Sequence, residues 1–472
     1  MLLITLVSVA SYEMNVRDDF DNSEIDPPII LTLSYLPIPD KNYSYRITDK
    51  STWNKYLEAG KQAVKHKDLI EQTTPSLPVS SPSYRHQKAV ATSTKATSLA
   101  YIGYIEEYAT MNFHRTVNST NRKEKICANS SVALDGLCAP NVVKCNYFSK
   151  YRSLNGSCNN LKHPETYGVS YTAFRRHLPP DYADGISKPR VSQNGTPLPS
   201  SRVVSLEIHP PLQITDSKFS VMLAIWGQFL DHDMTATASS RKANQETISC
   251  CNYNGVTHPE CFPVLLESYD PFTKNNVTCI EFVRSAPAPT CCLGPREQLN
   301  QVSAFIDGSV IYGADEELTR KLRTFDNGML KMLYTEDGRA LLPVSDDLTD
   351  GCNRHDQQVH GRYCFLTVQA FKPISGDARA NENLHLTSMH LLWARQHNLI
   401  ALNLSKMNPH WTDEIIFQEA RRIIGAQMQH ITYNEFLPAI LVVKQGQNQT
   451  TMRLCFPPDG QMPSRETKDR MT

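Results

Sequence analysis

The sequence has no excess of either charge, because 48 lysine and arginine residues balance 48 aspartate and glutamate residues over 472 positions. A nucleic-acid-binding domain is expected to carry a basic excess, so this composition argues against that class of partner. The chain also lacks any apolar run of 18 residues, and its mean hydropathy is −0.40, so we expect no transmembrane segment. The hydrophobic content of 40% is too high for a wholly disordered chain and is enough for a large core.

The 13 cysteines include no CxxC repeat, and two adjacent pairs are poorly arranged for tetrahedral metal ligation. These features favour local disulfides over a zinc site, because a short bridge restricts the unfolded chain without requiring distant strands to meet. Eight N-x-S/T sequons accompany the cysteines, and together they favour a secreted glycoprotein. The sequons begin at Asn42, Asn118, Asn129, Asn155, Asn194, Asn276, Asn403 and Asn448.

Residues 1–100 predict a signal-like leader followed by a propeptide and linker. Residues 2–10 form an apolar run of signal-peptide length, although no basic residue precedes it. Residues 51–72 are compatible with one polar helix. Residues 73–98 are rich in serine, threonine and proline and lack an apolar face, which is typical of a flexible linker.

The rest of the chain divides into three regions. Residues 101–144 form a connecting segment that contains cysteines, residues 145–443 form the main folded domain, and residues 444–472 form a divergent polar tail. Aromatic residues, cysteines and apolar periodicity appear together from about Cys145, and we find no internal repeat.

Three segments of the main domain show helical periodicity, and strand signals are sparse, so we expect a mainly α fold. The first helix is expected over about residues 217–235, where residues 215–217 offer N-caps. The second is expected over about residues 381–404. The third is expected over about residues 413–432, with Thr412 as its N-cap.

The segment WGQFLDHDM contains the first candidate functional residues. Gln228 and His232 are four positions apart and therefore share one helix face, and Asp231 and Asp233 flank the histidine. Acidic groups are seldom buried unless they are paired or bound to something, so their position beside Trp226 indicates a site. The alternative is an exposed acidic turn that contains an incidental histidine.

Oxygen-bearing side chains recur at Ser303, Asp307 and Ser309 in VSAFIDGSVIYG, where Gly308 permits a tight backbone. Ca²⁺ prefers six to eight oxygen ligands from carboxylates, hydroxyls and backbone carbonyls, so this pattern is compatible with a calcium loop. Taken alone, the pattern is more often that of a half-exposed strand or turn than that of a calcium loop.

Arg379 and Glu382 lie three positions apart in SGDARANEN, at the start of the second expected helix. A guanidinium here offers a fixed positive charge, whereas the alternative is a simple surface ion pair.

Six sequence motifs include most of these candidate residues. In their sequences and in their order along the chain, the motifs resemble the animal haem peroxidase superfamily, which includes myeloperoxidase and peroxidasin. The sequences of these motifs are most similar to those of the chorion peroxidase and peroxinectin branch. The resemblance covers about residues 145–441 and implies a mainly α peroxidase domain with disulfide-linked loops and little β structure. The motifs are CNYFSKYRSLNGSCNNLKHP, FRRHLPPDYADGIS, WGQFLDHDMTATA, FIDGSVIYG, SGDARANENLHLTSMHLLWARQHN and RRIIGAQMQHITYNEFLP.

The resemblance implies a distal haem site. His232 would be the distal histidine that moves a proton between the two peroxide oxygens. Gln228 would hold the distal water and halide, and Arg379 would stabilise the charge that develops as the O–O bond breaks. Asp231 and Glu382 match the carboxylates that form esters with haem b in this family.

The resemblance also implies a calcium site that fixes the helix of His232. Its ligands would be Asp233, Ser303, the backbone carbonyl of Phe305, Asp307 and Ser309. Ca²⁺ and covalently linked haem b are therefore the cofactors that we expect.

Within this framework, cysteine spacing suggests the bridges Cys145–Cys158, Cys251–Cys261 and Cys352–Cys364, with Cys250–Cys279 as a fourth. Asn383 follows Glu382 where myeloperoxidase carries a methionine that makes a third haem link. We therefore expect two ester links, and bromide, iodide, thiocyanate or tyrosyl donors rather than chloride.

The family's proximal histidine, the axial iron ligand, follows the YNEFLP segment within an R-x-G-H-like string, and this sequence has no such string. We expect residues 145–443 to supply the distal half of the domain, truncated before that ligand. The other helix histidines, His385, His390, His397, His410 and His430, are expected to be core or surface residues.

Two functions remain open. The first is a secreted haem peroxidase that reduces hydrogen peroxide, oxidises a halide or phenolic donor and takes part in the response to oxidative stress. The second is a catalytically inactive, calcium-binding secreted remnant or adhesion module. Either function allows an extracellular-matrix or cell-surface partner.

Overall fold

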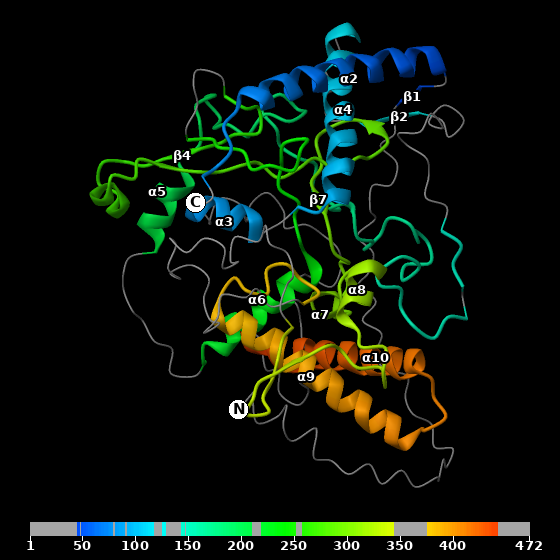
Figure 1. The fold of residues 1–472 in the computed structure, drawn as a ribbon. Coiled ribbons are helices and arrows are strands. Elements are labelled where there is room, and N and C mark those ends of the chain that lie inside the picture. The colour runs from blue at the N-terminus through cyan, green and yellow to red at the C-terminus, as the bar shows by residue number, and fades with distance from the viewer. Residues whose placement is uncertain are drawn as a thin grey trace, which may run out of the picture.

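The computed structural model describes residues 45–47, 49–78, 81–89, 92–117, 125–128, 143–146, 148–209, 219–251, 257–343 and 375–441. Helices dominate these residues, and every strand is two or three residues long, as expected for a mainly α protein (Figure 1). The helices are α2 (Lys50–Thr73), α3 (Pro82–Ala89), α4 (Thr94–Val117), α5 (Ser201–Ile208), α6 (Met222–Met234), α7 (Ser309–Tyr312), α8 (Glu316–Leu322), α9 (Leu384–Met407), α10 (Asp413–Ile431) and α11 (Leu437–Ile440). A 3₁₀ turn, η1 (Pro271–Asn275), and a π-helical turn, η2 (Thr432–Phe436), complete them.

The strands pair in four small sheets. β1 (Tyr45–Ile47), β2 (Ile126–Ala128) and β6 (Cys292–Leu293) form a sheet in that order, with β1 parallel to β2. The other sheets are two-stranded and antiparallel. They pair β3 (Thr172–Ala173) with β7 (Leu299–Asn300), β4 (Val264–Leu265) with β5 (Cys279–Ile280), and β8 (Leu333–Tyr334) with β9 (Ala340–Leu341).

Helices α2 and α4 cross at one end of the molecule, whereas α9 and α10 lie at the other end (Figure 1). The crossing is close, because a Cβ added at Gly60 would lie 2.3 Å from the carbonyl oxygen of Ile105. Trp53 and Tyr104 belong to one buried cluster that also includes Leu299 of the body of the protein. The contact between α2 and α4 was not predicted from the sequence, because polar residues alternate with the buried apolar residues of α2.

The expectation of a flexible linker over residues 73–98 is wrong where the structure describes them. This segment contains α3 and the start of α4, and Leu77 and Ala96 are buried. The backbone N–H of Leu77 donates to the hydroxyl of Thr247 at 3.0 Å, so a distant loop fixes the segment.

Buried ions also connect α4 to the body. Arg296 donates to Glu260 at 2.6 and 3.0 Å and to Glu107 of α4 at 2.9 Å. Burial would lower the pKa of Arg296, but the two carboxylates raise it well above its ordinary value. Because charges this deep are costly when unpaired, these groups lock α4 in one position.

An aromatic cluster joins α6 to α9. Phe229 of α6 and Trp393 of α9 stack with ring centroids 6.4 Å apart and planes at 8°. Trp226 lies 6.0 Å from Trp393, and all three rings are buried. This contact fixes the helix on which the candidate histidine lies.

The three expected helices of the main domain are present, and two of them start at other residues than expected. α10 begins at Asp413, as expected, because the Thr412 hydroxyl accepts a hydrogen bond from the N–H of Ile415 at 3.3 Å. α9 begins at Leu384 rather than 381, since Asn383 is its N-cap. α6 begins at Met222, and the expected caps at 215–217 lie outside the described residues.

Four disulfides form among the described cysteines. Cys145–Cys158 confirms the expectation, whereas Cys352 and Cys364 lie outside the described residues. The expected pairings Cys251–Cys261 and Cys250–Cys279 are wrong, because the adjacent cysteines are bonded the other way round, as Cys250–Cys261 and Cys251–Cys279. Adjacent residues point in different directions, and spacing alone does not reveal which direction each takes. Cys127–Cys292, between residues 165 positions apart, was not expected.

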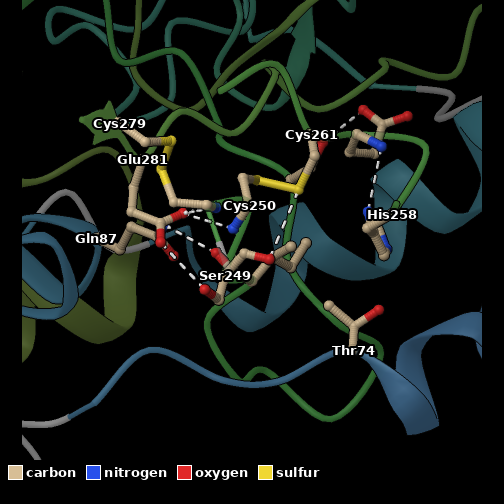
Figure 2. Close-up of a disulfide and its surroundings, with 12 residues drawn as sticks. Thr74, Gln87, Ser249, Cys250, His258, Cys261, Cys279 and Glu281 are labelled. Atoms are coloured by element: carbon tan, nitrogen blue, oxygen red, sulfur yellow. Dashed lines mark hydrogen bonds between the residues drawn. A yellow bond between two sulfur atoms is a disulfide. The ribbon is translucent and has the colours of Figure 1, made fainter. Parts of the chain in front are cut away.

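Glu281 stabilises the adjacent cysteine pair. Figure 2 shows its carboxylate accepting hydrogen bonds from the backbone N–H groups of Cys250 and Cys251, and from Ser249. The two backbone N–H groups of this turn thereby have a hydrogen-bond partner.

None of the described helices has the length and apolar character that a membrane span requires.

Candidate active site

Three candidate residues converge at the end of α6. The Nε2 atom of His232 lies 3.7 Å from the Oε2 atom of Glu382, and the Gln228 amide donates to the same oxygen at 3.4 Å. Asn383 donates to the Gln228 carbonyl oxygen at 3.1 Å. Two segments about 150 residues apart in sequence therefore meet on the face of α6 that carries Gln228 and His232.

Arg379 lies against the C-terminal end of the same helix. Its Nη2 atom donates to the backbone carbonyls of His232 at 3.2 Å and Thr235 at 2.7 Å. The last carbonyls of a helix lack intrahelical partners, so a guanidinium there satisfies them and matches the helix dipole.

Asp377 fixes the orientation of Arg379. Its carboxylate accepts from Arg379 Nε at 3.0 Å, from Nη2 at 2.6 Å and from the backbone N–H at 2.6 Å. Burial would raise the pKa of Asp377, but its bonds to Arg379 hold it below the ordinary value. The carboxylate of Asp377 is therefore ionised at neutral pH.

The electrostatics of His232 favour a neutral imidazole. The residue is 5% exposed. Burial, and then the positive charge of Arg379, lowers the pKa of His232 below its ordinary value. Its Nδ1 atom is buried without a hydrogen-bond partner. A neutral imidazole has one ring nitrogen whose lone pair can take up a proton from a bound molecule.

The two carboxylates expected to bind haem are both accessible. Asp231 and Glu382 are exposed, and Asp231 accepts only a bond from the Thr235 hydroxyl at 2.9 Å among the contacts described for its side chain. Exposed carboxylates beside a buried imidazole and a fixed guanidinium fit the distal side of a haem group, because each could reach a ligand without disturbing the core.

Four of the candidate calcium residues, Asp233, Ser303, Asp307 and Ser309, are brought together and buried. Asp233 accepts from the backbone N–H groups of Asp307 at 3.1 Å and Val310 at 3.0 Å. Ser303 donates to Asp307 at 2.7 Å, and Ser309 donates to the backbone carbonyl of Asp233 at 2.8 Å. The loop therefore docks on the end of α6.

Gly308 permits this docking. Its φ of 80° is a left-handed value that favours glycine, and its N–H lies 3.3 Å from the Asp233 carboxylate. Phe305 is half-buried in the same loop.

The charge state of this loop fits a hard cation. Burial, and then the negative charge of Asp307, raises the pKa of Asp233 to about 8. Burial also raises the pKa of Asp307. Two buried carboxylates, together with hydroxyl and carbonyl oxygens, are the donors that Ca²⁺ prefers.

Within the described ranges no cluster of three or more His, Cys, Asp or Glu side chains is arranged to hold a metal. The candidate calcium set contains only two such residues and completes its donors with serine and backbone oxygens. Of the remaining helix histidines, His390 and His397 are buried, whereas His385, His410 and His430 are exposed.

Sequence reasoning missed two residues that act on the candidate site. Asp377 orients Arg379, and Asn383 contacts Gln228. A carboxylate two positions before a functional arginine was a usable signal for Asp377. Nothing in the sequence indicated the contact of Asn383, because it depends on how α9 packs against α6.

A family model for animal haem peroxidases matches residues 151–462. Human myeloperoxidase is 40% identical over 316 residues, which cover 63% of this chain and 41% of that protein. Chorion peroxidase of Drosophila melanogaster is 38% identical over 320 residues, which cover 65% of this chain and 38% of that protein. The human peroxidasin homolog is 40% identical over 316 residues, which cover 62% of this chain and 20% of that protein.

This chain belongs to the animal haem peroxidase family. It spans less than half the length of these relatives. The vertebrate and insect identities differ by only two percentage points, so they do not favour one branch of the family.

Proposed function

We propose that this chain carries the distal half of a secreted haem peroxidase. Its reaction would reduce hydrogen peroxide and oxidise a halide or a phenolic or tyrosyl donor, which would contribute to the response to oxidative stress. The observation that carries the proposal is the meeting of Gln228, His232 and Glu382 beside Arg379, in a chain of the animal haem peroxidase family.

His232 would move the proton. Its Nε2 atom faces Gln228 and Glu382 rather than the core, and its lowered pKa favours the neutral form at pH 7. A neutral imidazole would accept the proton from the first peroxide oxygen and return it to the departing one.

Arg379 and Gln228 would serve the reacting oxygens. The Arg379 charge, held by Asp377, would stabilise negative charge on the peroxide as its O–O bond breaks. The amide of Gln228 would orient a water molecule or a halide by hydrogen bonding.

When bound, haem would supply the iron and the redox equivalents of the reaction. Asp231 and Glu382 would hold it through ester bonds, and both carboxylates are exposed. Ca²⁺ would be held by Asp233, Asp307, Ser303, Ser309 and the carbonyl of Phe305, and would fix the end of α6. We also propose that residues 145–443 form the peroxidase domain, joined by residues 101–144 to the preceding region and followed by a divergent tail over residues 444–472.

The second candidate is an inactive, secreted calcium-binding module. It is favoured by one observation: the paired carboxylates Asp233 and Asp307 are assembled within this chain and need no haem.

The visible spectrum of the full chain, expressed with haem and Ca²⁺, separates the two candidates. A Soret band that survives extraction with acidified acetone is expected for covalently held haem. The double variant Asp231→Asn/Glu382→Gln should bind haem but lose it on extraction. If the chain shows no Soret band while Ca²⁺ still raises its melting temperature, the peroxidase proposal is wrong and the calcium module is favoured.

A further inference from the structure

A basic cavity lies between α10 and the loop around residue 151, and Ile306 and Asp307 also line it. It has a volume of about 240 Å³. Its walls include Lys150, Arg152, Arg421 and Arg422, together with Asp307. None of the four cations has a part in the reaction proposed above.

Positive charge exceeds negative charge around this cavity. Four cations line the cavity, and two carboxylates oppose them: Asp307, which also lines it, and Glu419, which pairs with two of the cations. Glu419 pairs with Lys150 and lies 3.7 Å from Arg422. Because one carboxylate serves two cations, the cavity keeps an uncompensated positive charge.

Arg421 provides a buried donor. The residue is 6% exposed, and its Nη1 and Nη2 atoms donate to the backbone carbonyls of Arg152 at 2.8 Å and Ser153 at 3.0 Å. These bonds fix the guanidinium plane. Its Nε–H is buried and has no hydrogen-bond partner. Arg421 lines the cavity, and a guanidinium held in a fixed plane is suited to oxyanions, whose geometry matches its N–H groups.

We propose that this cavity binds a small tetrahedral oxyanion of the sulfate or phosphate class. The volume lies below the range of about 300 to 1,000 Å³ that holds drug-sized ligands, so it suits a single anionic group. The group is either a free ion or the terminal sulfate of a sugar chain. Binding does not depend on haem.

Isothermal titration calorimetry on the full chain tests the proposal. Sodium sulfate and sodium phosphate are titrated at an ionic strength held constant with sodium chloride. Saturable binding of one anion per chain is expected. Arg422→Gln and Arg152→Gln should each weaken it about tenfold, the loss expected for one charged hydrogen bond. Both side chains are exposed, so these variants should fold.

Arg320→Gln is the matched control, because it removes the same charge from the exposed face of α8, away from the cavity. Its affinity should equal that of the unchanged protein. Absence of saturable binding, or equal weakening in Arg320→Gln and Arg422→Gln, would overturn the proposal. A sulfated disaccharide in a parallel titration identifies the source: tighter binding than sulfate indicates a sugar chain, and weaker binding indicates the free ion.

Discussion

The guanidinium of Arg379 donates a hydrogen bond to the backbone carbonyl of His232, at 3.2 Å and across 147 positions of sequence. Arg379 therefore contacts the peptide backbone of His232, the candidate proton acceptor, as well as placing its charge near the imidazole ring. Its position sets both the end of α6 and the charge near the imidazole. A substitution of Asp377, which holds Arg379, should therefore affect both the stability of this helix end and the reaction at His232.

Asp377→Asn should show this dependence. The substitution breaks a buried ion pair and leaves Arg379 without its counter-charge, so we expect the free energy of unfolding to fall by about 3–5 kcal/mol. In haem-loaded protein, peroxide consumption should fall as well. Urea denaturation measures the first effect. Asp337→Asn, which breaks an exposed pair with Arg339, should change stability by at most about 0.5 kcal/mol. Equal losses of stability in Asp377→Asn and Asp337→Asn would contradict the role of Asp377 in holding Arg379.

His232→Ala should separate proton transfer from haem retention. Loss of a general base is expected to slow the reaction with peroxide by about 10²–10⁴-fold. The haem content should stay close to that of the unchanged protein, because the ester-forming carboxylates remain. Stopped-flow absorbance measures the rate, and His430→Ala, at an exposed position of α10, is the control. Unchanged peroxide kinetics in His232→Ala would refute its role.

Calcium should stabilise the protein through Asp233. A ligand that binds only the folded state raises its stability by about 2.7 kcal/mol at a concentration 100 times its dissociation constant. We expect Ca²⁺ to raise the melting temperature, chelation to lower it, and Asp233→Asn to abolish the response. Differential scanning fluorimetry measures these shifts. Asp326→Asn, at an exposed turn, should respond to Ca²⁺ as the unchanged protein does. A full response in Asp233→Asn would show that the metal binds elsewhere.

His397 should make the protein sensitive to acid. Its Nδ1 atom lies 2.8 Å from the Tyr312 hydroxyl, and its Nε2 atom lies 2.9 Å from the carbonyl of Gly328. Both nitrogens of the neutral ring are thus satisfied. Burial lowers the pKa of His397 to about 4, below the ordinary value of 6.5. The unfolded state therefore binds a proton first, and the stability contributed above pH 6.5 is lost as the pH falls from 6.5 to 4.

The variant His397→Gln should show a shallower loss over this pH range. The difference between the two proteins should be on the order of 3 kcal/mol at most. Urea denaturation at pH 7, 6, 5 and 4 measures it. Parallel stability curves for the two proteins would mean that His397 does not titrate differently in the folded and unfolded states.

Trp53→Ala tests whether α2 is an integral part of the fold. Trp53 is 1% exposed at the α2–α4 crossing, and truncation of a buried tryptophan costs about 3–5 kcal/mol. Leu69→Ala, at a position on the same helix that is 58% exposed, should cost far less. Equal losses in chemical denaturation would mean that the crossing contributes little to folding.

Local signals accounted for the elements that the sequence predicted well. Thr412 caps α10 through a bond to a residue three positions away, so its start could be read from neighbouring residues. The shared face of Gln228 and His232 follows from helix geometry alone. Their meeting with Glu382 depended on motif order, because no local signal brings together residues about 150 positions apart.

Long-range packing accounted for the misses. The helical crossing of α2 and α4 is stabilised by residues such as Leu299 that lie far along the chain. The pairing of Cys250 and Cys251 depends on the direction in which each side chain leaves its turn, which Glu281 fixes by accepting both backbone N–H groups. Spacing carries no information of that kind.

The Cys127–Cys292 bridge bears on how such a protein could be matured by proteolysis. A single peptide bond cut anywhere between these two cysteines would leave two fragments joined through sulfur. Helices α2 and α4 would then stay attached to the remainder of the molecule until a reductant separated them. Electrophoresis with and without dithiothreitol would distinguish a nicked two-fragment protein from one that has truly shed its amino-terminal portion.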